Sequence, residues 1–72
     1  MPILQVYLVE GRSEDQKSAF IASVTEAAVS TLGVPAETVR VVIMETPAAN
    51  WGKGGTSIKH LAARREDPEP GS

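Results

Sequence analysis

The stretch Ile-Leu-Gln-Val-Tyr-Leu-Val at residues 3–9 decides the fold. It is a short apolar run rich in residues that favour strands, and Gln5 is its only strongly polar member. Such a run is more typical of a strand buried on both faces than of an amphipathic strand. Glu10 and Gly11 end the run. We therefore expect a buried strand over residues 3–9.

A helix start signal follows this strand. Ser13 is a suitable N-cap, and Gln16 lies three residues later, which is the spacing of a capping box. Gly33 is a good C-terminal stop, and Pro35 prevents the helix from continuing. Between these signals apolar residues recur at helical spacing, and polar residues such as Lys17 would face water. The pattern predicts one long helix of about five turns.

A second strand is predicted from Thr38 to Met44, where the sequence is Thr-Val-Arg-Val-Val-Ile-Met. Strand, helix and strand form a βαβ unit, whose strands should be parallel and whose crossover should be right-handed. The expected fold class is α/β (α+β), a βαβ subunit with parallel strands and one long helix. The helix can cover only one face of this sheet, so we expect another copy of the chain to cover the other.

The remaining sequence predicts smaller features. Residues 46–50 read as a loop, and three glycines at residues 52, 54 and 55 favour a turn or small hairpin. Residues 57–65 could add one short helix or strand. Residues 66–72 hold two prolines, a glycine and three acidic residues, which is typical of a disordered tail. We expect a single domain over residues 1–65 with a disordered tail over residues 66–72.

The length and composition limit how this subunit can be stabilised. The chain has 72 residues, and a lone monomer of about that length buries only about 60% of its surface. There is no cysteine, which excludes disulfides and thiolate metal sites, and one histidine cannot form a zinc cluster. By elimination, self-association is expected to supply the missing stability, and no metal is expected.

The charge balance excludes several classes of partner. Seven basic and nine acidic residues give a net charge of −2, which provides no basic field for nucleic acid. The N-terminus does not resemble a signal peptide, and no apolar run approaches the ~20 residues of a membrane span. We expect a cytoplasmic protein with no nucleic-acid or membrane partner.

Pro2 is the first candidate for chemistry. Methionine is normally removed before so small a residue, which would leave proline at the N-terminus. A free N-terminal proline is a secondary amine in a rigid ring, and burial or nearby cations would lower its pKa. A base tuned in this way could work near neutral pH. With Met1 attached, Pro2 is an amide without a basic lone pair, and proline at position 2 can also simply begin a strand.

Two arginines are candidate binding residues. Arg12 alone is typical of a solvated loop residue. Arg40 interrupts an apolar run, where a charge is costly unless it is paired or lies at a rim. Its guanidinium could clamp a carboxylate in a two-pronged fashion, or it could be an edge arginine paired with Glu37 or Glu45.

Trp51 lies beside Gly52 in a polar, flexible segment. It could cap the hydrophobic core, or it could form the apolar wall of a pocket that keeps water from a basic amine. We interpret Lys53 as a solvated loop lysine with a lesser possibility of touching an anionic ligand. His60 is interpreted as a surface residue of the last short element.

Together these residues resemble the 4-oxalocrotonate tautomerase family. The resemblance runs without gaps from Pro2 to about Arg65. It is carried by five pieces of sequence, namely Pro-Ile-Leu-Gln-Val at 2–6, Glu-Gly-Arg-Ser at 10–13, Gln16-Lys17, Val39-Arg40-Val41 and the glycines at 52, 54 and 55. It implies a subunit that assembles into a homohexamer, described as a trimer of dimers, and an enzyme that needs no cofactor.

The resemblance also implies a role for each site residue. Pro2 would be the general base and then the acid, shuttling a proton between the carbons of a dienol and its conjugated ketone. Arg12 would hold the distal carboxylate of the substrate. Arg40 would hold and polarise the 2-hydroxyl or 2-oxo group and the near carboxylate, and Trp51 would supply the apolar wall.

The family substrate is 2-hydroxymuconate, which is converted to 2-oxo-3-hexenedioate in the degradation of catechol-type aromatics. Two departures leave this chain's own substrate open. The family usually has phenylalanine where this chain has Trp51, and usually an apolar residue where this chain has Lys53.

The leading functional hypothesis is therefore a cofactor-independent tautomerase acting on a small dicarboxylate or 2-oxo acid dienol such as 2-hydroxymuconate. One alternative is a tautomerase of the same mechanism in another catabolic or biosynthetic pathway. The other is a catalytically silent oligomeric module. Loss of Met1 would favour catalysis, and its retention would favour the silent module.

Overall fold

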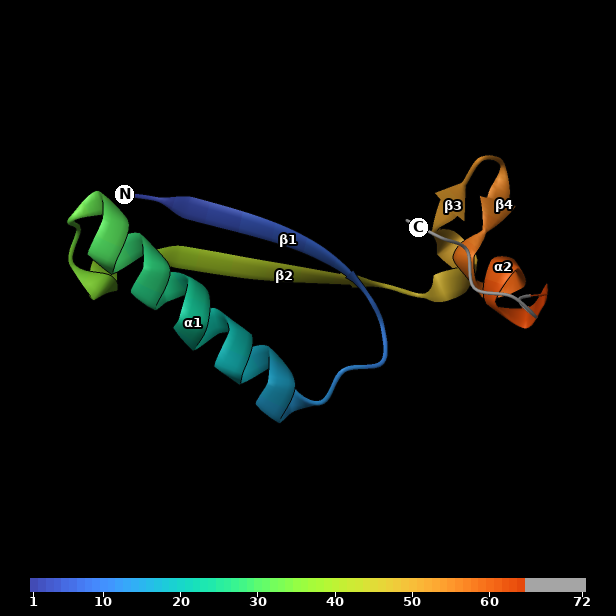
Figure 1. Ribbon diagram of the computed structural model, residues 1–72, viewed down its shortest axis with the longest axis horizontal. Coiled ribbons are helices and arrows are strands. Elements are labelled where there is room, and N and C mark those ends of the chain that lie inside the picture. Colours follow the sequence, from blue (N-terminus) through green and yellow to red (C-terminus); the bar gives the residue numbers. More distant parts are fainter. Residues whose placement is uncertain (65–72) are drawn as a thin grey trace.

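The computed structural model describes residues 1–64 of the chain. Figure 1 shows β1 and β2 side by side, with β3, β4 and α2 gathered beyond the end of β2. In chain order the elements are β1 (Ile3–Val9), α1 (Glu14–Leu32), the 3₁₀ turn η1 (Ala36–Thr38), β2 (Arg40–Thr46), the 3₁₀ turn η2 (Ala48–Asn50), β3 (Gly52–Lys53), β4 (Thr56–Ser57) and α2 (Ile58–Arg64).

The first two strands form the parallel sheet that the sequence predicts. Ile3 pairs with Arg40 at one end of the sheet, and Val9 pairs with Thr46 at the other. The one long helix, α1, connects the two strands. The expected βαβ fold class is confirmed, and β1 has the predicted bounds.

The ends of α1 are set by the residues that signalled them. The Gln16 backbone N–H donates to Ser13 Oγ at 3.1 Å, and the Gln16 side-chain oxygen accepts from the Ser13 backbone N–H at 2.9 Å. This reciprocal pair is the predicted capping box. Gly33 ends the helix with φ of 69°, a left-handed conformation that favours glycine.

The predicted bounds of the second strand are wrong by two residues. The prediction was Thr38 to Met44, whereas β2 runs from Arg40 to Thr46. The difference arises because Pro35 is followed by η1, in which the Thr38 hydroxyl donates to the Pro35 carbonyl at 2.8 Å. Thr38 therefore closes a turn, and Arg40 becomes the first residue of the strand.

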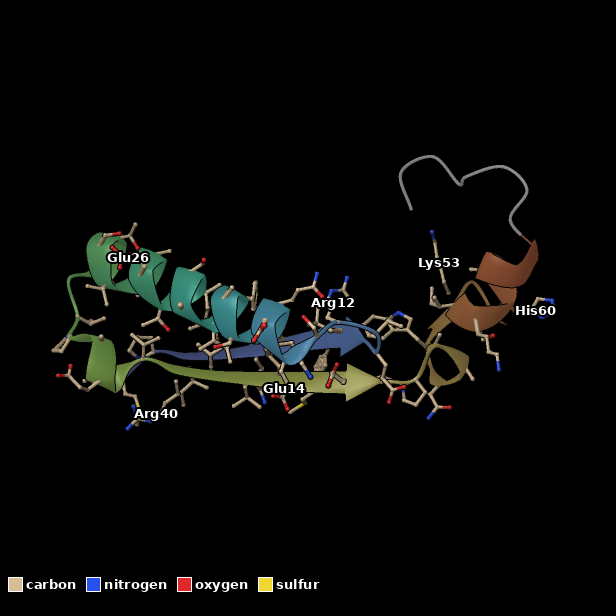
Figure 2. The ribbon with its side chains drawn as sticks, turned by 90° about the horizontal axis from the view of Figure 1, so that it is seen from below. Arg12, Glu14, Glu26, Arg40, Lys53 and His60 are labelled. Carbon is tan, nitrogen blue, oxygen red and sulfur yellow. The ribbon has the colours of Figure 1, made fainter. Side chains whose placement is uncertain are left out.

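Only one face of the sheet is covered. Figure 2 shows α1 lying along one side of the two strands. Leu4, Val6 and Leu8 alternate along β1 and are half-buried. On the other face, Ile3 is 63% exposed and Tyr7 is 54% exposed. The prediction that β1 is buried on both faces therefore does not hold within one chain.

The core of the described chain is small. Among residues 1–61, whose side chains are described, Ala28 and Val39 are the only ones that are buried, at 8% and 9% exposure. Large apolar side chains such as Leu32, Val42 and Met44 stay exposed. Much of the apolar surface of this subunit therefore stays exposed to solvent in a single chain.

The C-terminal part forms a separate small unit at the end of β2. The glycines after Trp51 turn the chain between β3 and β4, which pair antiparallel as the predicted hairpin. The short helix α2 follows and packs on η2 and β4. The predicted tail over residues 66–72 lies outside the described residues. No helix in residues 1–64 is both long enough and apolar enough to span a membrane.

Candidate active site

Pro2 and Arg40 are neighbours at the beginning of the parallel sheet. The Arg40 backbone N–H donates to the Pro2 carbonyl at 2.9 Å, which continues the strand ladder by one residue. Pro2 is half-buried, and Arg40 is exposed. The parallel pairing thus joins two predicted site residues that are 38 positions apart in the sequence.

The Arg40 side chain is available for a ligand. Its guanidinium donates to the backbone carbonyl of Glu37 rather than pairing with that residue's carboxylate. Glu45 is engaged elsewhere, because its carboxylate lies 2.8 Å from Lys17 Nζ. Within the described residues Arg40 forms no salt bridge, so the two ion-pair partners considered for it are not used. A guanidinium carries five N–H donors, and most of them remain for a carboxylate or an oxo group.

Arg12 lies at the opposite end of the sheet, in the loop between β1 and α1. Gly11, just before it, has φ of 133°, which L side chains rarely adopt. Arg12 is exposed, and its Nη1 donates to the Val9 carbonyl at 3.0 Å. The loop is fixed to the sheet by a hydrogen bond of 3.0 Å from the Glu10 N–H to the Thr46 carbonyl.

Trp51 follows η2 at this same end of the chain's sheet. Its N–H donates to the Ala48 carbonyl at 3.3 Å, and its carbonyl accepts from the Ile58 N–H at 2.7 Å. The tryptophan is half-buried, which fits both the core-capping and the pocket-wall interpretation. Lys53 and His60 are exposed, as the sequence led us to expect.

The four candidate residues do not form one site within a single chain. Figure 2 shows Arg12 and Arg40 near opposite ends of the sheet. A strand rises about 3.3 Å per residue, so the seven residues of β1 separate the Pro2 end from the Arg12 end by roughly 23 Å. An arginine side chain is too short to cross that distance. The structure therefore brings Pro2 to Arg40 but leaves Arg12 and Trp51 apart from them.

One interaction near the site was missed by the sequence interpretation. Lys17 was expected to face water, but it forms a salt bridge with Glu45, and the two side chains are only 24% and 29% exposed. The partners are 28 positions apart, so no local spacing signals the pair. Only the strand register, which sets Glu45 opposite Leu8 on the helix-covered face, could have indicated it.

Comparisons with known proteins agree with this architecture. A family model described as "Tautomerase enzyme" matches residues 2–61. A probable tautomerase of Ralstonia nicotianae is 58% identical over 68 residues, which cover 94% of this chain and 93% of that protein. A 2-hydroxymuconate tautomerase of Comamonas testosteroni is 51% identical over 61 residues, which cover 85% of this chain and 97% of that protein.

A solved structure shows the same similarity in three dimensions. TomN, a 4-oxalocrotonate tautomerase homologue in the tomaymycin biosynthetic pathway, superimposes with a TM-score of 0.84 at 44% identity. The superposition covers 86% of this chain and 95% of TomN. Because the family match begins at Pro2 and runs through the βαβ unit and the hairpin, the chain belongs to the tautomerase family of enzymes.

Proposed function

We propose that this protein converts a dienol such as 2-hydroxymuconate to its conjugated 2-oxo acid. The reaction moves one proton from the 2-hydroxyl oxygen to carbon 5 while the double bonds shift, and no electron is gained or lost. The observation that carries the proposal is the contact between Pro2 and Arg40 in a chain that is 51% identical to a 2-hydroxymuconate tautomerase.

Pro2 is the proposed general base and then the general acid. Removal of Met1 turns its nitrogen into a secondary amine whose rigid ring has little conformational freedom to lose. The backbone of Arg40 pairs with that of Pro2, and a guanidinium brought near the free amine would lower its pKa and favour the free base near neutral pH. The amine accepts the proton from the substrate hydroxyl and returns a proton to carbon.

Arg40 and Arg12 divide the recognition of the substrate. Arg40 binds the 2-oxygen and the near carboxylate, and it stabilises the negative charge that develops on that oxygen. Arg12 binds the distal carboxylate, away from the reacting atoms. Trp51 provides an apolar wall that keeps water from the amine. No cofactor is needed, because the reaction is a proton transfer.

The site is proposed to be shared between chains. The described sheet has the order β1–β2, so β1 keeps one unpaired edge. Antiparallel pairing of two β1 strands across a twofold axis would satisfy that edge and bring Pro2 of one chain toward Arg12 of the other. The exposed apolar side chains on the uncovered face of the sheet support further assembly, and a homohexamer is the state that the family resemblance implies.

The test is the decay of dienol absorbance with purified protein whose mass shows that Met1 is absent. We expect ketonisation well above the uncatalysed rate, and retention of Met1 should abolish it because Pro2 is then an amide. Processed protein that does not accelerate ketonisation would overturn the proposed substrate class. Retention of Met1 in protein from its native cell would favour the silent oligomeric module instead.

A second candidate function is supported by the likeness to TomN, which belongs to a biosynthetic pathway. The mechanism would be the same, with another dienol or 2-oxo acid as substrate. Comparing kcat/KM for 2-hydroxymuconate with kcat/KM for dienols that lack one carboxylate separates the two candidates, since only a substrate with both carboxylates uses both arginines.

A further inference from the structure

The loop that carries Arg12 is held at both of its ends by the last residues of β2. At the start of the loop, the Glu10 N–H donates to the Thr46 carbonyl at 3.0 Å. Just beyond its other end, in the first turn of α1, Lys17 Nζ lies 2.8 Å from Glu45 Oε1. Glu45 and Thr46 are consecutive, so one short segment of β2 fixes both ends.

Lys17 transmits its anchor directly to the loop. Its backbone N–H donates to the Ser13 carbonyl at 3.1 Å, which closes the first turn of α1 beside Arg12. Its ammonium group then holds this turn on β2. The pair is only 24% and 29% exposed, and water and salt screen such a pair less than a fully exposed one.

The position of Lys17 is unfavourable for the helix itself. The N-terminus of a helix carries a partial positive charge, which favours Glu14 and Asp15 in the first turn and disfavours a lysine at the fourth helical residue. Glu45 compensates this charge from another element. A residue that violates a local preference beside a candidate site points to a role beyond helix stability.

Arg12 has little else to fix its position. The hydrogen bond from its side chain to the Val9 carbonyl is exposed, and Gly11 before it has no side chain that could pack and hold the loop. We propose that Lys17 and Glu45 are positioning residues that set Arg12 for the distal carboxylate of the substrate. This inference rests on the role given to Arg12 in the proposed function.

The first experiment measures steady-state kinetics of Lys17→Met with the dicarboxylate dienol. We expect KM to rise about threefold to tenfold while kcat stays within about twofold, because Arg12 acts away from the reacting atoms. Glu45→Gln should also raise KM. It replaces Lys17→Met as the test variant if Lys17→Met fails to fold. Lys17→Arg keeps the charge and should restore the normal KM.

Two matched controls remove a charge without touching the loop. Glu26→Gln changes an exposed carboxylate further along α1, and Lys59→Met changes an exposed lysine on α2. Both should leave KM and kcat unchanged. A rise in KM for Lys17→Met that Lys59→Met reproduces would reflect loss of general positive charge and would overturn the proposal.

The second experiment repeats Lys17→Met in the Arg12→Ala background. If Lys17 acts through Arg12, the double variant should have the KM of Arg12→Ala alone, since interacting residues are not additive. If Lys17→Met raises KM further in the Arg12→Ala background, Lys17 affects substrate binding by a route other than Arg12, which would overturn the proposal. Amide hydrogen exchange gives a readout without substrate, because the hydrogen-bonded amides of Glu10 and Lys17 at the two sides of the loop should exchange faster in Lys17→Met than in the wild type.

The outcomes separate this inference from the proposed function. If Arg12→Ala raises KM but Lys17→Met changes neither KM nor exchange in the loop, only the positioning inference is wrong. If Arg12→Ala itself leaves KM unchanged, the assignment of Arg12 to the carboxylate is wrong, and the positioning inference falls with it.

Discussion

At the scale of single residues, the candidate site is arranged by two hydrogen bonds to backbone carbonyls. The ladder bond from the Arg40 N–H to the Pro2 carbonyl fixes the backbone of Arg40 beside that of Pro2. The bond from Arg12 to the Val9 carbonyl keeps the second guanidinium at the far end of the same strand. Each arginine therefore has a distinct environment, and each should produce a distinct kinetic effect when it is removed.

Pro2→Ala should lower kcat by about 100-fold or more, which is the scale of general acid–base catalysis. The substitution replaces a rigid secondary amine with a primary amine that has more freedom and a different basicity. The loss in kcat is measured from the steady-state decay of dienol absorbance. Mass spectrometry must first show that Met1 is removed from the variant as well. A rate close to normal would take Pro2 out of the mechanism.

Arg12→Ala and Arg40→Ala should differ in which constant they change. Arg12→Ala should mainly raise KM, because the distal carboxylate is bound equally in the ground state and the transition state. Arg40→Ala should also lower kcat, because charge develops on the oxygen that it binds. Saturation curves for the two variants test this division of labour, which is contradicted if both change KM alone.

At the scale of secondary structure, the elements whose limits are set by local chemistry could be predicted from the sequence. The limits of α1 follow from Ser13, Gln16 and Gly33, whose contacts are all within one turn. The start of β2 could not be predicted as well, because the 3₁₀ turn after Pro35 competes with the strand for Thr38. The Lys17–Glu45 pair was missed since it depends on register between distant elements.

Ser13→Ala should lower the free energy of unfolding by about 1 kcal/mol, which is the typical effect of losing an N-cap. Urea unfolding followed by circular dichroism measures the change, at one fixed protein concentration because the stability of an oligomer depends on it. Ser23→Ala is the matched control, since Ser23 is exposed in the middle of α1 and caps nothing. Equal effects of the two substitutions would contradict the role of the cap.

At the scale of the whole molecule, one chain carries two incomplete halves of the proposed site. Pro2 and Arg40 lie at one end of the sheet and Arg12 and Trp51 at the other, as the labels in Figure 2 show for the two arginines. The candidate residues could be named from the sequence, but their separation to opposite ends of one chain's sheet could not, because it depends on the parallel pairing of the two strands. A straight strand cannot bring its own two ends together.

Mixing Pro2→Ala chains with Arg12→Ala chains, after denaturation and refolding, should restore activity at low substrate concentration. A mixed dimer holds one intact site, built from Pro2 of one chain and Arg12 of the other. Random pairing of equal amounts should recover about a quarter of the wild-type kcat/KM. The absence of recovery, in oligomers shown by mass to be mixed, would mean that the two residues do not meet across an interface.

The small core of a single chain should make the amount of active protein depend on its concentration. With only Ala28 and Val39 buried among the residues whose side chains are described, a newly made chain gains little by folding alone. Binding to a further copy, as proposed, would add stability by mass action, so both the folded fraction and the number of complete sites should increase with the amount of protein made. Specific activity should therefore fall on dilution, and a low level of expression would keep the enzyme silent without any inhibitor.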